Sequence, residues 1–240
     1  MHESRDVVTV IEALRPLLTQ EALTLPNEYR YAHVSLALID AIYSINARYE
    51  SVRRTVLRYA NYAHLNPYRP CVGTWPSRAQ QQPLSAFLDL LDARGADDAA
   101  ERIFQNRQRT STRNGILKAE AVREAARLLV TYGVSYFQDI PHVIDSREFI
   151  QAFRSLRGQG SGTSLTYFWM LTGSESLAKP DRQILRYLSR ILTRPLATSE
   201  EAIILLQRAV EVLKPEFPQL TTRALDYAIW QGERRQLSPE

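Results

Sequence analysis

The sequence predicts an all-α protein. Apolar residues recur at a spacing of about 3.6 along most of the chain, and Pro, Gly and Asn separate these stretches. No segment alternates apolar and polar residues for long enough to favour a strand, and no repeat period is present. These patterns together predict roughly ten helices.

The N-terminal helices follow from caps and apolar spacing. Ser4 is expected to cap a helix over Val7–Leu18, and Pro16 is expected to bend its end. Apolar positions over residues 31–45 predict a second helix, and the pattern over 51–64 predicts a third.

A long loop is expected over residues 66–83, which contain four prolines and Trp75. Loops of that length are often functional. Beyond this loop, helices are expected over 84–93, 97–106, 116–132, 163–171, 180–192, 198–214 and 221–231, with a turn at 110–115 and a helix capped by Ser146 that ends near Leu156.

Composition excludes several classes of protein. Cys71 is the only cysteine, and the four histidines are far apart, so we expect no disulfide, no iron–sulfur cluster and no protein-ligated transition metal. The first residues are charged, unlike a signal peptide, and the longest apolar runs are too short to cross a bilayer. We therefore expect a cytoplasmic protein without a membrane partner.

Positive charge is concentrated in two arginine clusters. The net charge is +4, and the isoelectric point is about 9.3. Five arginines and one acid lie between Arg48 and Arg69, and four arginines and no acid lie between Arg102 and Arg113. Such clusters suit a polyanion such as DNA, although a solvated surface with ordinary arginine usage explains either cluster alone.

The most informative segment is the glycine-rich stretch over residues 156–164, Leu-Arg-Gly-Gln-Gly-Ser-Gly-Thr-Ser. A dinucleotide-binding fingerprint would follow a strand, whereas the preceding segment is helical, and the Gly-Lys-Ser/Thr of a P-loop is missing. Helix, glycine turn and helix together can hold a phosphate on backbone N–H groups. A plain helix–helix turn is the alternative interpretation.

This stretch resembles the hairpin of the helix-hairpin-helix (HhH-GPD) DNA glycosylase superfamily, Leu-Pro-Gly-x-Gly-x-x-Thr-Ala. The matching residues are Leu156, Gly158, Gly160 and Thr163, with Ser164 as the small residue. In that superfamily an Asp follows about 25 residues after the hairpin's Leu, and Asp181 stands at that position here. The resemblance covers roughly residues 30–190.

The resemblance implies a two-lobed helical architecture. Residues 30–135 would form a central helical lobe, 146–172 the helix-hairpin-helix, and 1–29 with 173–240 a second lobe that carries the catalytic Asp181. The DNA-binding residues would be Gly158, Gln159, Gly160, Gly162, Thr163, Asn46 as a wedge into the duplex, Arg48, Lys179 and Arg182. A pocket for a flipped base would draw on Trp75, Tyr68, Tyr167 and Trp169.

Departures from the superfamily pattern narrow the expected chemistry. Members with β-lyase activity carry a Lys where this chain has Gly162, so a Schiff base cannot form there, and the iron–sulfur cysteines are missing. Arg157 and Gln159 replace a Pro and an apolar residue, and Asp181-Arg182-Gln183 replaces Asp-Thr-His. Pro180 suits the first position of a helix, which would place Asp181 at its N-terminal edge, where an acid is also common without any catalytic role.

The resulting hypothesis is a monofunctional DNA glycosylase that acts as a monomer on double-stranded DNA. It would hydrolyse the N-glycosidic bond of a modified or damaged base and leave an abasic site, in repair or in phage defence. It would need no cofactor, with a monovalent or divalent cation at the hairpin turn left open. The alternatives are a non-catalytic helix-hairpin-helix DNA-binding protein and a helical scaffold whose arginines surround a protein interface.

Overall fold

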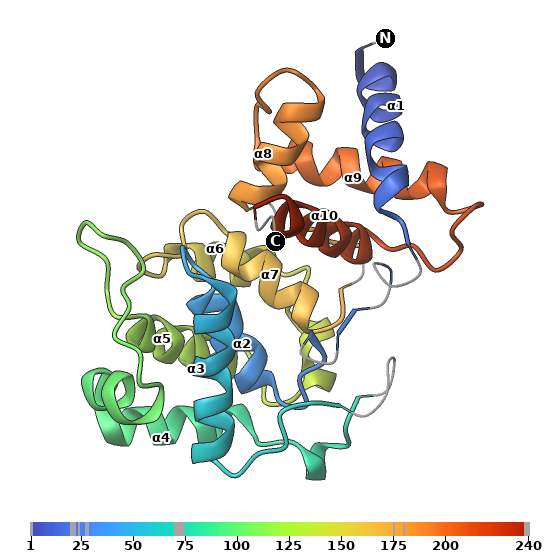
Figure 1. Ribbon diagram of the computed structural model, residues 1–240. Coiled ribbons are helices and arrows are strands. Elements are labelled where there is room, and N and C mark those ends of the chain that lie inside the picture. Colours follow the sequence, from blue (N-terminus) through green and yellow to red (C-terminus); the bar gives the residue numbers. More distant parts are fainter. Residues whose placement is uncertain are drawn as a thin grey trace. The chain divides into compact units, whose positions relative to one another are not determined.

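The computed structural model describes residues 2–19, 23, 25–26, 29–69, 75–174, 176–179 and 181–237, with the side chains of 2–4 and 234–237 excepted (Figure 1). In these ranges the chain is helical, and its only β-structure is two isolated bridges, Tyr31–Tyr68 and Arg109–Leu117. The predicted all-α class is therefore confirmed. The chain forms two compact units, residues 27–172 and residues 1–26 with 173–240.

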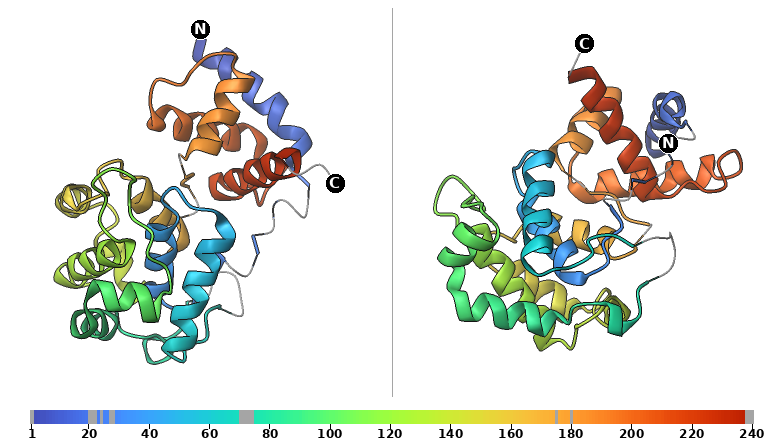
Figure 2. Two further views of the ribbon diagram at one scale, coloured as in Figure 1. Left: turned by 60° about the vertical axis from the view of Figure 1, so that its left-hand side comes forward. Right: turned by 60° about the horizontal axis from the view of Figure 1, so that its bottom comes forward.

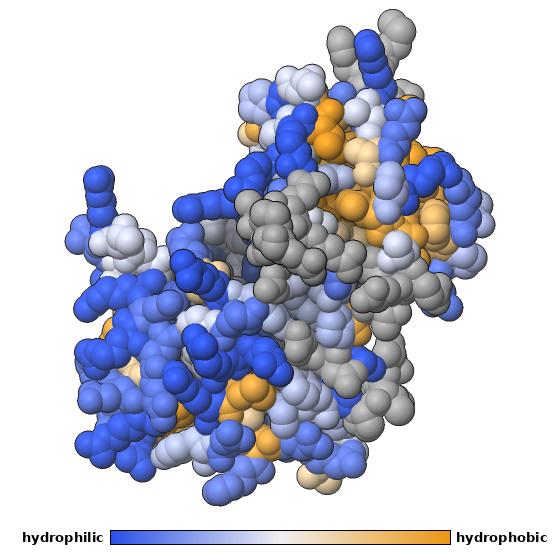
Figure 3. All heavy atoms as spheres, in the orientation of Figure 1, coloured by the Kyte–Doolittle hydropathy of each residue, from blue (hydrophilic) through white to orange (hydrophobic). Residues whose placement is uncertain are grey.

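The unit of residues 27–172 is built around a buried helix. Its α-helices are α2 (Val34–Tyr43), α3 (Tyr49–Tyr62), α4 (Leu84–Asp98), α5 (Lys118–Thr131), α6 (Arg147–Ser155) and α7 (Thr163–Leu171). Every residue of α2 is buried, and α3, α5 and α7 pack against it (Figure 2). A helix that is apolar on all sides needs such neighbours. The face that α3 presents in Figure 3 is mostly hydrophilic, in keeping with the exposed Arg53 and Arg54.

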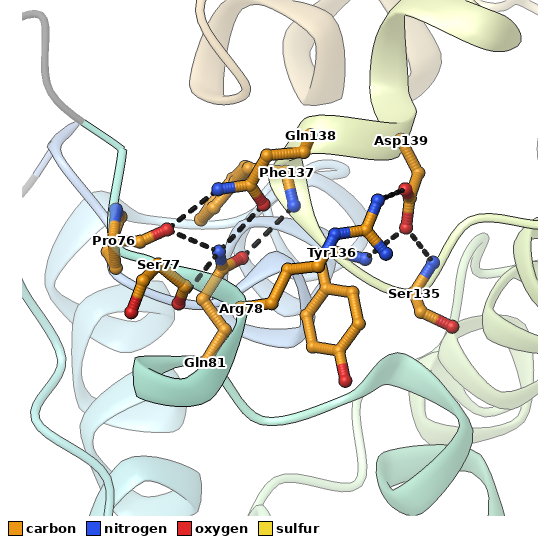
Figure 4. A network of polar contacts seen from close by, with 9 residues as sticks. All are labelled: Pro76, Ser77, Arg78, Gln81, Ser135, Tyr136, Phe137, Gln138 and Asp139. Atoms are coloured by element: carbon orange, nitrogen blue, oxygen red, sulfur yellow. Dashed lines mark hydrogen bonds and ion pairs between the residues drawn. The ribbon is translucent and has the colours of Figure 1, made fainter.

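A polar network anchors the long loop that precedes α4 (Figure 4). The buried amide of Gln81 donates to the backbone oxygen of Pro76 at 2.7 Å and to the side chain of Gln138 at 2.9 Å, and it accepts from the N–H of Phe137 at 3.0 Å. Beside it, Arg78 donates to Asp139 at 2.6 Å. Because these groups satisfy one another, the last third of the loop is held against the 3₁₀ helix Phe137–His142.

A buried ammonium joins three segments of this unit. The side chain of Lys118, at the start of α5, is 1% exposed. Its Nζ donates to the backbone oxygens of Tyr43 and Ile45 at 2.9 and 2.5 Å and to the side-chain oxygen of Gln108 at 3.0 Å. The end of α2, the segment before the 110–115 turn and the start of α5 are thereby tied to one cation.

The other unit consists of the two ends of the chain. Its α-helices are α1 (His2–Leu14), α8 (Arg182–Ile191), α9 (Ser199–Leu213) and α10 (Thr222–Leu237), and a 3₁₀ helix (Arg15–Leu17) follows α1. Leu14, Leu188, Leu206 and Leu225, one from each α-helix, lie in a common apolar core. An ion-pair cluster joins Arg194 to Asp6 and Glu201, both at 2.6 Å.

Two expected helix starts are wrong. The first helix begins at His2, so Ser4 lies inside it rather than at its cap. Helix α8 begins at Arg182, with Asp181 as its N-cap, whereas a start at residue 180 was expected; Pro180 itself lies outside the described residues. The switch from α1 to a 3₁₀ helix at Pro16 and the caps of α6 by Ser146 and of α9 by Thr198 agree with the sequence patterns.

None of the helices in the described ranges combines the length and the apolar character needed to cross a membrane.

Replacing Lys118 should destabilise the unit of residues 27–172. We expect Lys118→Met to lower the free energy of unfolding by about 3 kcal/mol, because it leaves one buried and two partly buried oxygens without their charged donor. Urea denaturation measures the change. Lys214→Met is the control, since Lys214 is exposed and should cost less than about 0.5 kcal/mol. Equal stability of both variants would contradict a structural role for this ammonium.

Candidate nucleic-acid interface and carboxylate site

The glycine-rich stretch forms a tight turn between α6 and α7. Helix α6 ends at Ser155, and Leu156 is extended with ψ 146°. Gly158 and Gly162 have φ values of +82° and +74°, which residues with a side chain rarely adopt. Gly162 is the N-cap of α7. The expected succession of helix, glycine turn and helix is therefore present, and two of its glycines are required by their backbone conformation.

The outer part of this turn offers free backbone donors. Gly160 and Ser161 are exposed, and their N–H groups make no hydrogen bond to any residue that the structure describes. By contrast, the N–H of Gly162 donates to Gln159 at 2.9 Å, and that of Thr163 reaches the hydroxyl of Ser161 at 3.3 Å. Free N–H groups just before the N-terminus of a helix favour an anion such as a phosphate.

The side chain of Gln159, which was expected to contact DNA, is buried. It is 0% exposed, and its Oε1 accepts a hydrogen bond from the hydroxyl of Ser164. Its backbone N–H donates to the oxygen of Leu156 at 3.0 Å. The Nε2 of Gln159 is buried without a hydrogen-bond partner among the described residues, whereas Oε1 links the hairpin to the start of α7. A contact of this residue with DNA stays a prediction.

The turn over 110–115 packs directly against the hairpin. A Cβ on Gly158 would lie 2.6 Å from the side chain of Thr110, which is buried. The bridge between Arg109 and Leu117 closes this turn, and its tip carries the exposed Arg113. The contact between this turn and the hairpin was not predicted from the sequence.

Arg113 differs from the other arginines of that cluster. Arg102 and Arg107 form ion pairs with Asp98 and Asp97, at 2.8 and 2.9 Å. Arg109 donates to the backbone oxygen of Gly115 at 2.8 Å. The guanidinium of Arg113 has no partner among the described residues, so it is available to a phosphate.

The expected wedge lies on an exposed turn of the same unit. Asn46 has a φ of +49° and is exposed, directly after the backbone oxygen of Ile45 that Lys118 binds. Arg48 is exposed at the N-cap of α3. Both side chains are thus accessible on a turn that a buried cation holds.

The four aromatic residues expected in a base pocket are used for packing. Tyr167 and Trp169 are 7% and 5% exposed on α7. The ring of Tyr68 stacks on that of Tyr31 with centroids 6.0 Å apart. Trp75 packs against Phe137 at 4.2 Å, and the Arg69 guanidinium lies 3.6 Å from the Trp75 ring. Within the unit of residues 27–172 these rings stabilise the fold, and their role toward a base stays a prediction.

Asp181 is the N-cap of α8 in the other unit. Its Oδ1 accepts hydrogen bonds from the N–H groups of Gln183 and Ile184 at 2.8 and 3.2 Å. Its own N–H donates to the oxygen of Lys179 at 2.7 Å. The cap uses only Oδ1. The second oxygen, Oδ2, makes no hydrogen bond to the described residues. The neighbouring Arg182 is exposed, and Lys179 is half-buried.

A second carboxyl group, which sequence reasoning missed, lies near Asp181. The Oδ1 of Asp226, on α10, accepts a hydrogen bond from the Lys179 N–H at 2.9 Å. Burial, followed by the negative charge of Asp181, raises the pKa of Asp226 to about 8. No local motif marks this residue, because the fold brings together two positions that are distant in the sequence.

Within the described ranges, no three His, Cys, Asp or Glu side chains lie together in a way that would hold a metal ion. The cation considered for the hairpin turn stays a prediction.

The chain belongs to a family described as a domain of unknown function, DUF8548, whose model matches residues 8–234. No curated protein matches the chain, and no solved structure matches it. The match spans both units, so the hairpin and Asp181 belong to the same family domain. The resemblance to HhH-GPD glycosylases stays a prediction.

The contact between Gly158 and Thr110 can be tested with a matched pair of glycines. Gly133 has a φ of +79° and open space around its Cβ position, whereas Gly158 has a φ of +82° and faces Thr110. Gly133→Ala should cost about 1–2 kcal/mol of unfolding free energy from backbone conformation alone. Gly158→Ala should cost roughly 1–3 kcal/mol more, because Thr110 must move. Chemical denaturation of both variants measures the difference, and equal losses would show that the contact does not affect stability.

Proposed function

We propose that this protein is a monofunctional DNA glycosylase of the helix-hairpin-helix type. The observation that carries the proposal is the hairpin itself, whose exposed Gly160 and Ser161 N–H groups precede the N-terminus of α7. The position of Asp181 after that hairpin, at the start of α8, adds a carboxylate of the kind that such chemistry needs.

The hairpin would hold DNA through its sugar–phosphate backbone. Backbone N–H groups bind a phosphate oxygen without reading sequence, and the exposed Arg113, on the 110–115 turn whose Thr110 contacts Gly158, supplies a charged donor. Asn46 and Arg48, on another exposed turn of the unit, suit the filling of the gap that a flipped nucleotide leaves. These contacts support binding of double-stranded DNA with little preference for sequence.

Asp181 would supply the chemistry. As the bond between the sugar C1′ and the base nitrogen breaks, its electron pair leaves with the base, and the sugar becomes oxocarbenium-like. The free Oδ2 of Asp181 is suited to stabilise this cation and to orient a water molecule for attack on C1′. The carboxylate can accept the proton that the water loses, and the departing base gains a proton, so the products are an abasic site and a free base.

The absence of a lysine at position 162 favours hydrolysis over a lyase reaction. Gly162 has no side chain, and its φ of +74° suits its role as N-cap of α7. A Schiff base with the sugar cannot form at this position, so water is the nucleophile. The excised base would be modified or damaged, in a repair or a defence pathway.

A non-catalytic DNA-binding protein is the second candidate, because one observation favours it. Asp181 caps α8, and this structural role accounts for the residue without any chemistry. A helical scaffold would instead bind no DNA.

Asp181→Asn should separate catalysis from binding. Asn is as good an N-cap as Asp, so α8 should remain intact and the stability should change little. We expect the wild type to release a base from one member of a panel of modified-base duplexes, and the variant to lose that release by at least about 100-fold. Mass spectrometry of the released base and cleavage of the abasic product by alkali measure the reaction.

The control for this experiment is Asp145→Asn, an exposed acid in the other unit that should keep full release. Equal release by the wild type and Asp181→Asn would refute the role of Asp181. Salt-sensitive DNA binding without release from any duplex would favour the non-catalytic candidate.

Arg113 should contribute one phosphate contact. Arg113→Gln is expected to weaken DNA binding for all sequences and to reduce the slope of log K against log salt concentration by about 1. Arg102→Gln is the control within the same cluster, because Arg102 is paired with Asp98 and should leave the slope nearly unchanged. Fluorescence anisotropy at several salt concentrations measures both slopes, and an unchanged slope for Arg113→Gln would exclude this contact.

A further inference from the structure

Asp226 is attached to the segment that carries Asp181. The Lys179 N–H donates to the Oδ1 of Asp226 at 2.9 Å, and the Lys179 oxygen accepts from the N–H of Asp181 at 2.7 Å. One residue, Lys179, therefore links the two carboxyl groups through both of its backbone polar atoms. A displacement of Asp226 would therefore act, through Lys179, on Asp181 at the start of α8.

The surroundings of Asp226 favour its neutral form. Burial has the largest effect on the pKa of Asp226, and the negative charge of Asp181 follows; both raise it. The hydrogen bond from the Lys179 N–H and the charges of Lys179 and Arg223 lower it, but the balance leaves the pKa at about 8. At neutral pH, Asp226 therefore holds a proton.

Several other charged groups on α10 and on the elements packed against it form ion pairs. Glu233, on α10, pairs with Arg190 at 2.6 Å and Arg186 at 3.8 Å, both on α8. Arg15, in the 3₁₀ helix after α1, pairs with Glu216. These ion pairs leave Asp181, Lys179 and Arg223 as the charges that act on Asp226.

We propose that Asp226 is a positioning residue for Asp181, and that the two carboxyl groups act as a pair joined through the backbone of Lys179. In this pair Asp226 accepts the Lys179 N–H and so holds the segment that leads to Asp181. Where the proposal concerns activity it rests on the proposed glycosylase function, but the pairing itself is a property of this unit alone.

The raised pKa of Asp226 determines whether the stability of the folded protein rises or falls with pH. An isolated Asp in the unfolded chain loses its proton near pH 3.9, whereas Asp226 in the folded chain keeps its proton up to about pH 8. Between these two values the folded state binds more protons, so stability falls as the pH rises through this window. Asp226→Asn keeps an oxygen that can accept from Lys179 and cannot ionise, so it should remove this fall.

The decisive experiment is an NMR titration of the aspartate carboxyl carbons in the full chain. We expect the Asp226 signal to titrate near pH 8 in the wild type and at a clearly lower pH in Asp181→Asn, because that variant removes the second cause of the shift. Titration of Asp226 in the usual range of about 3–5, or an unchanged midpoint in Asp181→Asn, would overturn the pairing. This readout needs no substrate, so a failed glycosylase proposal would not decide it.

A second measurement tests the positioning role. With a substrate in hand, base release by the wild type should fall above about pH 8 as Asp226 ionises, and Asp226→Asn should retain release at that pH. Asp226→Ala, which cannot accept from Lys179, should lose at least tenfold in release across the whole pH range. If Asp226→Asn and the wild type share one pH profile while the carboxyl titration is as expected, the pair exists but does not position Asp181.

Without any substrate, the slope of unfolding free energy against pH serves as the comparison between Asp226→Asn and the wild type, and equal slopes would also overturn the proposal.

Discussion

The buried ammonium of Lys118 is the constraint on which the unit of residues 27–172 depends. Burying a cation is costly unless oxygens replace its water, and here Tyr43, Ile45 and Gln108 do so. Two of these oxygens are at the C-terminal end of α2, where the helix leaves its last carbonyls without partners and where a positive charge is favoured. One side chain thus ends the central helix and fixes the start of α5. It also holds the segment that leads into the 110–115 turn, and that turn packs against Gly158 of the hairpin.

The helix caps and the glycine turn could be predicted from the sequence because they depend on local chemistry. Ser146 and Thr198 each accept a hydrogen bond from a backbone N–H three residues later, so their caps can be read from short patterns. The positive φ of Gly158 and Gly162 likewise agrees with a residue type that tolerates it. Ser4 failed as a cap because the helix continues to His2, and a serine is tolerated inside a helix when nothing upstream ends it.

Other features could not be predicted from the sequence, because they depend on contacts that only the fold reveals. The burial of Gln159 was not predicted, because glutamine is mostly exposed in proteins, whereas here its Oε1 accepts from Ser164 inside the hairpin. Arg113 differs from Arg102 and Arg107 only because these two arginines form ion pairs, which the sequence does not reveal. Asp226 belongs to no recognisable motif. Its proposed role depends on a hydrogen bond from Lys179 and on the charge of Asp181, which are both distant from it in the sequence. Polar residues in this chain are therefore informative only when their partners are known.

The capping role of Asp181 and a chemical role do not exclude each other. The cap engages Oδ1 alone, and two N–H groups on that oxygen fix the plane and direction of the whole carboxylate. A carboxylate fixed in this way keeps Oδ2 in one place without reorganisation, which is the condition under which electrostatic stabilisation of a developing cation is effective. The negative charge of Asp181 is, after burial, the second cause that raises the pKa of the neighbouring Asp226. Because the backbone of Lys179 also joins the two carboxyl groups, they are best understood as one unit.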